Sequence, residues 1–413
     1  MTSECSYKIF FICLWTFCLC SITSAHAYEF PSYQGLSLNI TGNISGNYSN
    51  NITFARDYEE KIDQFTAMMI LGLGARYEGK RRTLGVAGQF RQPLYNSADI
   101  RNSSEILRLD VMNEFSKFDR LRLLNTYTHT KVSGSFEGSY VDEECRKLFI
   151  EYGIDAVRDD PRCNNFLDEF GREQGEFDAY RNIFNINFSK DFSDKINIAI
   201  GYINEIYDTS NNNLNDSIRN SVNARVNYKL SYATILFLTY SFSEISYDKG
   251  IDIATNSVRT GIRQYITKRL YFSGNVGMVF RPSTNSMTVD ALLTGELNDK
   301  TIVLIDFSRD IRSAIDREDE FRSWRITGRI TQTLMEEMDG FISAFYGEGD
   351  FVTAAVTDKL FGVSASLNYI FWQHKRGARV SGTSGYTYSI LNSTDTSREY
   401  DRSSINATLS IAF

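Results

Sequence analysis

Apolar and polar residues alternate along most of the chain. Segment 404–413 reads SINATLSIAF, and its odd-numbered residues are Ile405, Ala407, Leu409, Ile411 and Phe413. Side chains of a strand alternate between the two faces of a sheet, so this segment has one apolar and one polar face. Similar alternation recurs from Gly35 to the C-terminal end, which leaves no other layer of sequence to cover the apolar faces. Lipid is therefore the expected cover.

The predicted fold class is all-β, an antiparallel transmembrane β-barrel with apolar residues outward and polar residues toward the lumen. Alternation bounded by turn residues predicts eighteen strands, and sixteen is the alternative count because 232–246 and 338–348 have unclear registers. The predicted strands are 35–48, 64–78, 82–93, 104–116, 120–133, 179–191, 195–207, 217–229, 232–246, 255–266, 269–281, 285–296, 300–309, 321–334, 338–348, 359–371, 376–390 and 402–413.

Short and long connections alternate between these strands. Gly79-Lys80-Arg81, Asn298-Asp299 and Glu336-Glu337 are tight, whereas the intervening connections are longer and polar. Short periplasmic turns and longer outer loops are typical of bacterial outer-membrane barrels. We therefore expect a location in the bacterial outer membrane, with both termini in the periplasm. The longest connection, about 134–178, is expected to be an extracellular loop that folds over the mouth or into the lumen.

The two ends of the chain predict export and membrane assembly. Lys8, an apolar run at 9–19 and Ala25-His26-Ala27 predict a signal peptide over 1–27. The single barrel domain would then comprise 28–413. Phe413 resembles the C-terminal aromatic signature of outer-membrane barrels, which the barrel assembly machinery recognises. We expect that machinery and outer-membrane lipid to be partners of the chain.

Composition narrows the class further. The formal net charge is −7 and 42% of the residues are hydrophobic, with 24 Tyr and 29 Phe against 3 Trp. No segment after the N-terminal run has the roughly 20 apolar residues of a membrane-spanning helix. Modest acidity argues against nucleic acid as a partner. The sequence suggests no cofactor.

Cys145 and Cys163 are the two cysteines outside the predicted signal peptide. Because the periplasm is oxidising, we expect them to form a disulfide, which would contribute about 3 kcal/mol in the chain-entropy model. Two free thiols are the alternative. A metal site is not expected, since His129 and His374 are distant from the pair in sequence.

Arginine recurs at positions with the phase of the lumen face. A charged side chain facing lipid at the midplane would cost about 2 to 4 kcal/mol, so these side chains are expected to point inward. Guanidinium groups bind carboxylate or phosphate bidentately, which predicts passage of an anionic solute. The alternative is a set of structural ion pairs with inward acids such as Asp110, Asp290 and Asp306. The predicted lumen-lining arginines are Arg108, Arg181, Arg219, Arg225, Arg259, Arg263, Arg325, Arg329 and Arg379.

An enzyme is not expected, because neither His129 nor His374 lies in a compact catalytic motif. The opening segment 35–41, the arginine-bearing strands and the ending 404–413 resemble the outer-membrane β-barrel proteins encoded with exopolysaccharide gene clusters. That resemblance implies a conduit for export of an anionic polysaccharide, with a periplasmic polysaccharide-export protein as partner. A general diffusion porin is the second interpretation. A structural or adhesive barrel without transport is the third.

Overall fold

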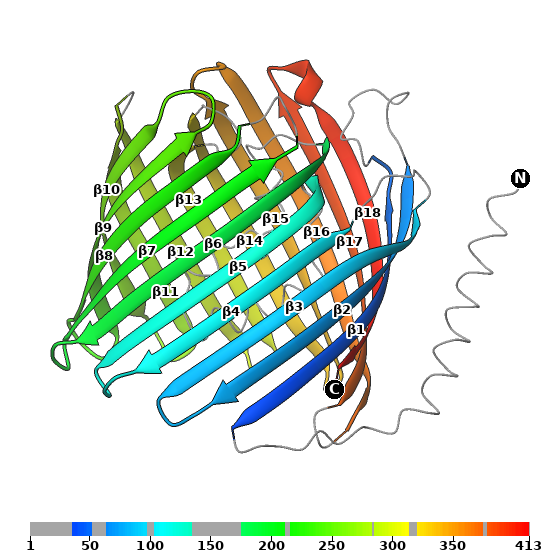
Figure 1. The fold of residues 1–413 in the computed structure, drawn as a ribbon, viewed down its shortest axis with the longest axis horizontal. Helices are drawn as coiled ribbons and strands as arrows, with labels where there is room; N and C mark the ends of the chain where they lie inside the picture. Colours follow the sequence, from blue (N-terminus) through cyan, green and yellow to red (C-terminus); the bar gives the residue numbers. More distant parts are fainter. Residues whose placement is uncertain are drawn as a thin grey trace, which may run out of the picture.

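The computed structural model describes residues 35–51, 63–96, 103–133, 175–210, 215–282, 285–313, 320–374 and 378–412. Within these ranges the chain forms one closed antiparallel sheet of eighteen strands (Figure 1). The predicted fold class and the count of eighteen are confirmed. The strands are β1 Leu36–Ser49, β2 Gln64–Glu78, β3 Arg82–Asn96, β4 Ser104–Glu114, β5 Asp119–Ser133, β6 Gly175–Asp191, β7 Ile196–Thr209, β8 Ser217–Lys229, β9 Thr234–Tyr247, β10 Ile253–Tyr265, β11 Leu270–Phe280, β12 Asn285–Asn298, β13 Thr301–Ser313, β14 Glu320–Met335, β15 Met338–Phe351, β16 Val356–Gln373, β17 Arg379–Ser393 and β18 Tyr400–Ala412.

Pairing of β1 with β18 closes the barrel. The register runs from Thr41 opposite Ala412 to Ser49 opposite Ser404. Every other strand pairs with its neighbours in the chain, so no edge strand remains. Closure satisfies the backbone hydrogen bonds of each strand within the sheet, which is required in a bilayer.

The tight connections all lie at one end of the barrel, which we call the short-turn end. Gly35 begins the ladder there with φ 84°, and its carbonyl oxygen accepts a hydrogen bond from Glu78 N at 2.6 Å. The β4–β5 turn is closed by Ser116, whose hydroxyl accepts from Phe118 N at 3.0 Å and donates to the Asp119 carboxylate at 2.8 Å. The C-terminal end of the chain lies at the same end of the barrel (Figure 1).

Several strands are longer than alternation predicted. Segment 338–348 is the beginning of β15, which continues to Phe351. Strand β6 begins at Gly175 and not at residue 179, because pairing with β5 resumes beyond a register shift, where one residue of β5 faces two of β6, and Ser133 pairs with Gly175. Its first residues therefore belong to the ladder and not to the predicted outer loop.

The outer wall is apolar over the whole circumference. Every strand except β5 has at least one exposed aliphatic or aromatic side chain among the described residues, for example Leu73 of β2, Ile200 of β7 and Ile342 of β15. An exposed apolar wall on a closed barrel is stable only in lipid. The chain is therefore a β-barrel of the bacterial outer membrane. No helix among the described residues is long and apolar enough to cross a membrane.

The interior contains an apolar cluster that alternation did not predict. Its six buried residues are Phe321, Phe345, Phe351, Leu360, Leu391 and Tyr400. They come from the inward face of β14 to β18, since their neighbours Tyr346, Phe361 and Ile326 are exposed on the outer wall. The expectation that inward residues are polar is thus wrong over this part of the barrel.

Other predictions fall on residues that the structure does not describe. These are the signal peptide 1–27, the pair Cys145 and Cys163, the assembly residue Phe413, and loop 134–178 up to Gly175. They remain predictions.

Candidate functional site in the barrel lumen

Inward side chains of neighbouring strands form rows around the lumen. The register places Arg219 beside Glu205, and Arg259 beside Gly277. Serine pairs link adjacent strands through their hydroxyl groups at 2.7 to 2.8 Å, namely Ser221–Ser243, Ser241–Ser257 and Ser343–Ser364. The lumen face, meaning the face opposite the exposed apolar residues, is therefore polar and hydrogen-bonded over much of the barrel.

Glu205 of β7 holds two of the predicted arginines. Its carboxylate accepts hydrogen bonds from Arg181 Nε of β6 at 2.6 Å and from Arg219 Nη1 of β8 at 3.1 Å. The Glu205 side chain is 4% exposed, and the two arginine side chains are 26% and 27% exposed. These charge-assisted bonds fix both guanidinium groups against the wall.

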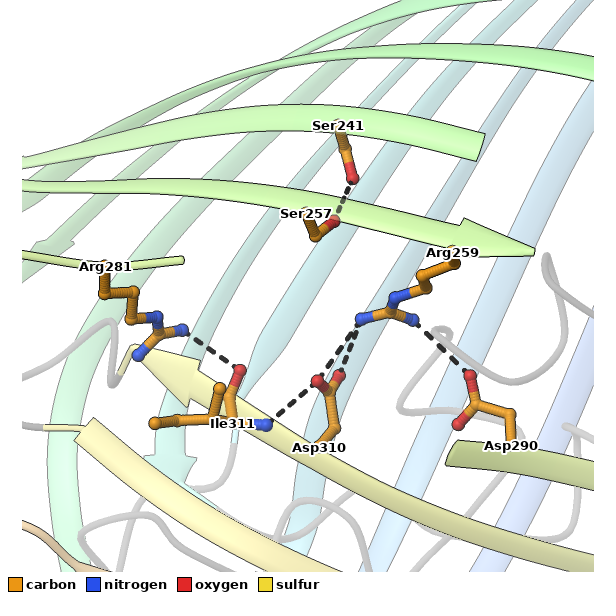
Figure 2. Close-up of polar contacts among 7 residues, drawn as sticks. All are labelled: Ser241, Ser257, Arg259, Arg281, Asp290, Asp310 and Ile311. Carbon is orange, nitrogen blue, oxygen red and sulfur yellow. Dashed lines mark hydrogen bonds and ion pairs between the residues drawn. The ribbon is translucent and has the colours of Figure 1, made fainter. Parts of the chain in front are cut away.

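Arg259 of β10 contacts two aspartates on more distant strands. Its Nη1 lies 3.4 Å from Asp290 Oδ2 of β12, and its Nη2 lies 3.2 Å from Asp310 Oδ1 of β13. Figure 2 shows the guanidinium between the two carboxylates. The side chain can lie along the wall because Gly277 stands opposite it, where a Cβ would come within 2.6 Å of Arg259 Cγ. The interaction therefore braces four consecutive strands.

Arg281, which follows β11, makes a second brace next to the first (Figure 2). Its Nη2 donates to the Ile311 carbonyl oxygen at 3.0 Å, and its Nη1 lies 3.3 Å from Glu320 Oε1. Burial lowers the pKa of the Arg281 guanidinium, and the Glu320 carboxylate opposes that shift. Arg281 was not among the predicted residues. It has the opposite phase to the exposed residues Val276, Met278 and Phe280 of β11, and this is the signal that could have identified it.

Two further predicted arginines lie on either side of a buried ring. The guanidinium carbon of Arg225 is 4.1 Å from the centroid of Phe237, and that of Arg263 is 5.8 Å from it. Phe237 is opposite Gly261 in the register, and a Cβ on that glycine would overlap the ring. Gly261 thus lets the ring lie flat against β10, beneath the arginines.

The same arrangement recurs between β14 and β15. Arg329 of β14 lies with its guanidinium carbon 4.0 Å from the centroid of Phe341 of β15. Its Nε lies 3.4 Å from the hydroxyl of Thr331. A cation over an aromatic face is attracted by the ring quadrupole. Neither Phe237 nor Phe341 was predicted, because alternation assigns apolar residues to the lipid face.

The remaining predicted arginines are spread around the lumen face. Arg108 of β4 is opposite Thr126 and is partly exposed. Arg325 is buried opposite Ser308, and Arg379 is opposite Gln373 near the short-turn end. The nine residues therefore do not form one continuous surface. Their role in transport stays a prediction.

Acidic residues pair with arginine more often than alternation indicated. Asp110 accepts a bidentate interaction from Arg122, at 2.9 Å from Nε and 2.6 Å from Nη2. Asp290 was expected to face inward and does so. Glu205 and Asp310 were not predicted to be inward acids, although both have the phase of the lumen face. The structural ion pairs of the alternative interpretation thus exist for Arg181, Arg219 and Arg259.

The connection between β17 and β18 is attached to β16 by an ion pair. Residues Thr396–Arg398 form a 3-10 helix, and Arg398 Nη2 lies 2.8 Å from Asp358 Oδ2 of β16. The Arg398 guanidinium also lies 4.9 Å from the centroid of Phe351. The Asp358 side chain is completely buried. This pair attaches the connection to the apolar cluster.

No group of three or more His, Cys, Asp or Glu residues in the described ranges could hold a metal ion. His129 of β5 is stacked on Tyr180 at 4.3 Å between ring centroids, and its Nδ1 is 4.0 Å from Glu105 Oε2. These three residues lie outside the lumen rows, since Arg108 and Thr126 define the inward phase of β4 and β5.

Comparison with known proteins supports the architecture. No family model matches the chain, and no curated protein matches it either. The crystal structure of Pseudomonas aeruginosa OccK2 (OpdF) in complex with glucuronate is 11% identical, covers 92% of this chain and 99% of its own, and has a TM-score of 0.51. Pseudomonas aeruginosa OpdK with vanillate is 10% identical, covers 91% of this chain and 99% of its own, and has a TM-score of 0.50. At this identity the likeness establishes the fold alone.

Proposed function

We propose that the barrel is an outer-membrane pore that favours anionic solutes. The observation that carries the proposal is the set of lumen-facing guanidinium groups over inward-facing rings, Arg225 and Arg263 over Phe237 and Arg329 over Phe341. A ring attracts a guanidinium through its face and accepts none of its N–H groups in conventional hydrogen bonds. The ring contacts therefore position three cationic groups in the lumen, and the rings themselves bring no negative charge.

The family resemblance suggests a more specific proposal. In it the solute is an acidic exopolysaccharide, and the partner is a periplasmic polysaccharide-export protein. Arginine rows would bind the carboxylate or phosphate groups of such a chain, while the serine and amide rows would bind its hydroxyl groups. A diffusion porin would instead pass small neutral sugars as readily as acidic ones. Swelling of vesicles containing the barrel, in neutral sugars and in uronic acid oligomers, distinguishes the two.

The test of anion preference is a bilayer recording of the variant Arg225→Gln, Arg263→Gln, Arg329→Gln in a salt gradient. Loss of three positive lumen charges should reduce the preference for anions, and the reversal potential should shift away from the equilibrium potential of the anion. The matched control replaces three arginines at the short-turn end, Arg82, Arg120 and Arg269, and changes the net charge by the same amount. An unchanged reversal potential in the lumen variant, from a pore that still opens, rejects the proposal. A wild-type barrel that conducts no ions would favour the structural or adhesive interpretation.

A further inference from the structure

The inner wall of β1 and β3 carries buried polar groups that have no hydrogen-bond partner in the described part of the chain. They are the Arg91 Nε, both amide atoms of Asn43 and the hydroxyl of Ser45. Arg91 is 8% exposed, and Asn43 and Ser45 are each 2% exposed. Arg91 was not among the arginines expected from the sequence.

The register places these groups together. Asn43 of β1 is opposite Ile70 of β2, and Ile70 is opposite Arg91 of β3, so the three occupy one row of the lumen face. Ser45 is in the next row, opposite Met68. Met68 and Ile70 are both buried and form an apolar floor between the polar groups. Arg91 and Asn43 are therefore separated by a single strand, β2.

Arg91 differs from the arginines of the neighbouring strands. Arg122 of β5 and Arg181 of β6 each have a carboxylate within 2.6 Å. Among the described residues, no carboxylate lies within ion-pair distance of Arg91, and no ring lies beneath it. Burial of a charged group without a partner is strongly unfavourable, and burial of an unpaired amide adds to that cost. A ligand that accepts hydrogen bonds from the Arg91 guanidinium and from the Asn43 amide would offset the cost of burying both groups.

We propose that Arg91, Asn43 and Ser45 form a binding site for an oxyanion of the carboxylate or phosphate class. Two oxygens of the anion accept from the Arg91 guanidinium, and either one of them, in a carboxylate, or a third oxygen, in a phosphate, accepts from Asn43 Nδ2 or the Ser45 hydroxyl. The apolar floor lowers the local dielectric and strengthens these bonds. The site is separate from the ring-held arginines, so it stands whether or not the barrel is anion-selective.

The experiment measures binding of inorganic phosphate and of acetate to the purified, folded full chain by calorimetry at constant ionic strength. Arg91→Gln should weaken binding at least tenfold, equivalent to about 1.4 kcal/mol. Asn43→Ala should weaken it by a smaller factor. The control Arg82→Gln removes an arginine from the short-turn end of the same strand and should leave binding unchanged.

Equal affinity in wild type and Arg91→Gln would overturn the proposal, as would a wild-type chain that binds neither anion. Arg91→Lys covers the case in which the glutamine variant fails to fold. It keeps the charge but not the planar fork, so it should bind phosphate more weakly than wild type. Wild-type affinity in Arg91→Lys would reject the bidentate geometry on which the site depends. If replacing the ring-held arginines leaves the reversal potential unchanged, the proposed anion preference of the pore is rejected. The results for phosphate and acetate binding at Arg91 are not affected by that outcome.

Discussion

Replacing Glu205 with glutamine tests whether the paired arginines of the lumen wall are structural. Glu205 is the shared acceptor for Arg181 and Arg219, at 2.6 Å and 3.1 Å. Glutamine keeps the shape and one acceptor oxygen but removes the negative charge. Arg181 of β6 and Arg219 of β8, on the two strands that flank β7, then lose the negative charge of this carboxylate.

The expected cost can be estimated from burial. Removing one partner of a buried ion pair typically costs about 3 to 5 kcal/mol. Because both arginine side chains are about one-quarter exposed, solvent screens part of that penalty, and we expect a loss of about 2 to 3 kcal/mol. The double variant Glu205→Gln, Arg219→Gln also removes one of the two positive charges that the Glu205 carboxylate binds. It should therefore be more stable than the single variant.

Reversible urea unfolding from lipid vesicles, followed by fluorescence of Trp324 and Trp372, measures these differences. The control Glu244→Gln makes the same chemical change on the exposed outer face of β9 and should stay within about 0.5 kcal/mol of wild type. A Glu205→Gln barrel as stable as that control would refute the structural role of the cluster. So would a double variant less stable than Glu205→Gln.

Two other substitutions have matched controls within the chain. Gly261→Ala should cost about 1 to 3 kcal/mol in unfolding free energy, because its Cβ would overlap the ring above it, whereas Gly42→Ala, with no atom within 4 Å of the added Cβ, should be neutral or slightly stabilising. Equal changes in unfolding free energy for Gly261→Ala and Gly42→Ala would show that packing of the Phe237 ring against Gly261 does not stabilise the barrel. Asp358→Asn should release Arg398 and make the β17–β18 connection susceptible to limited proteolysis, whereas Asp299→Asn in an exposed turn should not. A connection that stays resistant in Asp358→Asn would reject its attachment by this ion pair.

The architecture could be predicted from the sequence because it depends on a local property. Apolar residues at every second position and tight turns such as Gly79-Lys80-Arg81 recur along the chain, and each strand can be recognised without knowing its neighbours. Strand ends were less predictable, since they depend on the partner. The bulge at Thr130 and Val132 adds residues to β6 that no alternation within β6 indicates.

The chemistry of the lumen could be predicted only in part. Phase placed Arg259 on the lumen face, but its partners lie two and three strands away, and that reach depends on Gly277 being opposite. Inward aromatic residues such as Phe237 have no signal in an apolar-out pattern. Arg91 has the correct phase, yet only the register shows that Asn43 and Ser45 lie near it.

The lumen face holds its arginines in two physically different ways, and the difference bears on function. A carboxylate such as Glu205 cancels the charge of the guanidinium groups it binds and contributes chiefly to the stability of the wall. A ring such as Phe237 holds Arg225 and Arg263 in position and brings no negative charge of its own. A ring contact and a carboxylate contact therefore contribute differently to the field inside the barrel. Charge removal should consequently change stability at Glu205 and selectivity at the two rings, and the variants proposed above separate these effects.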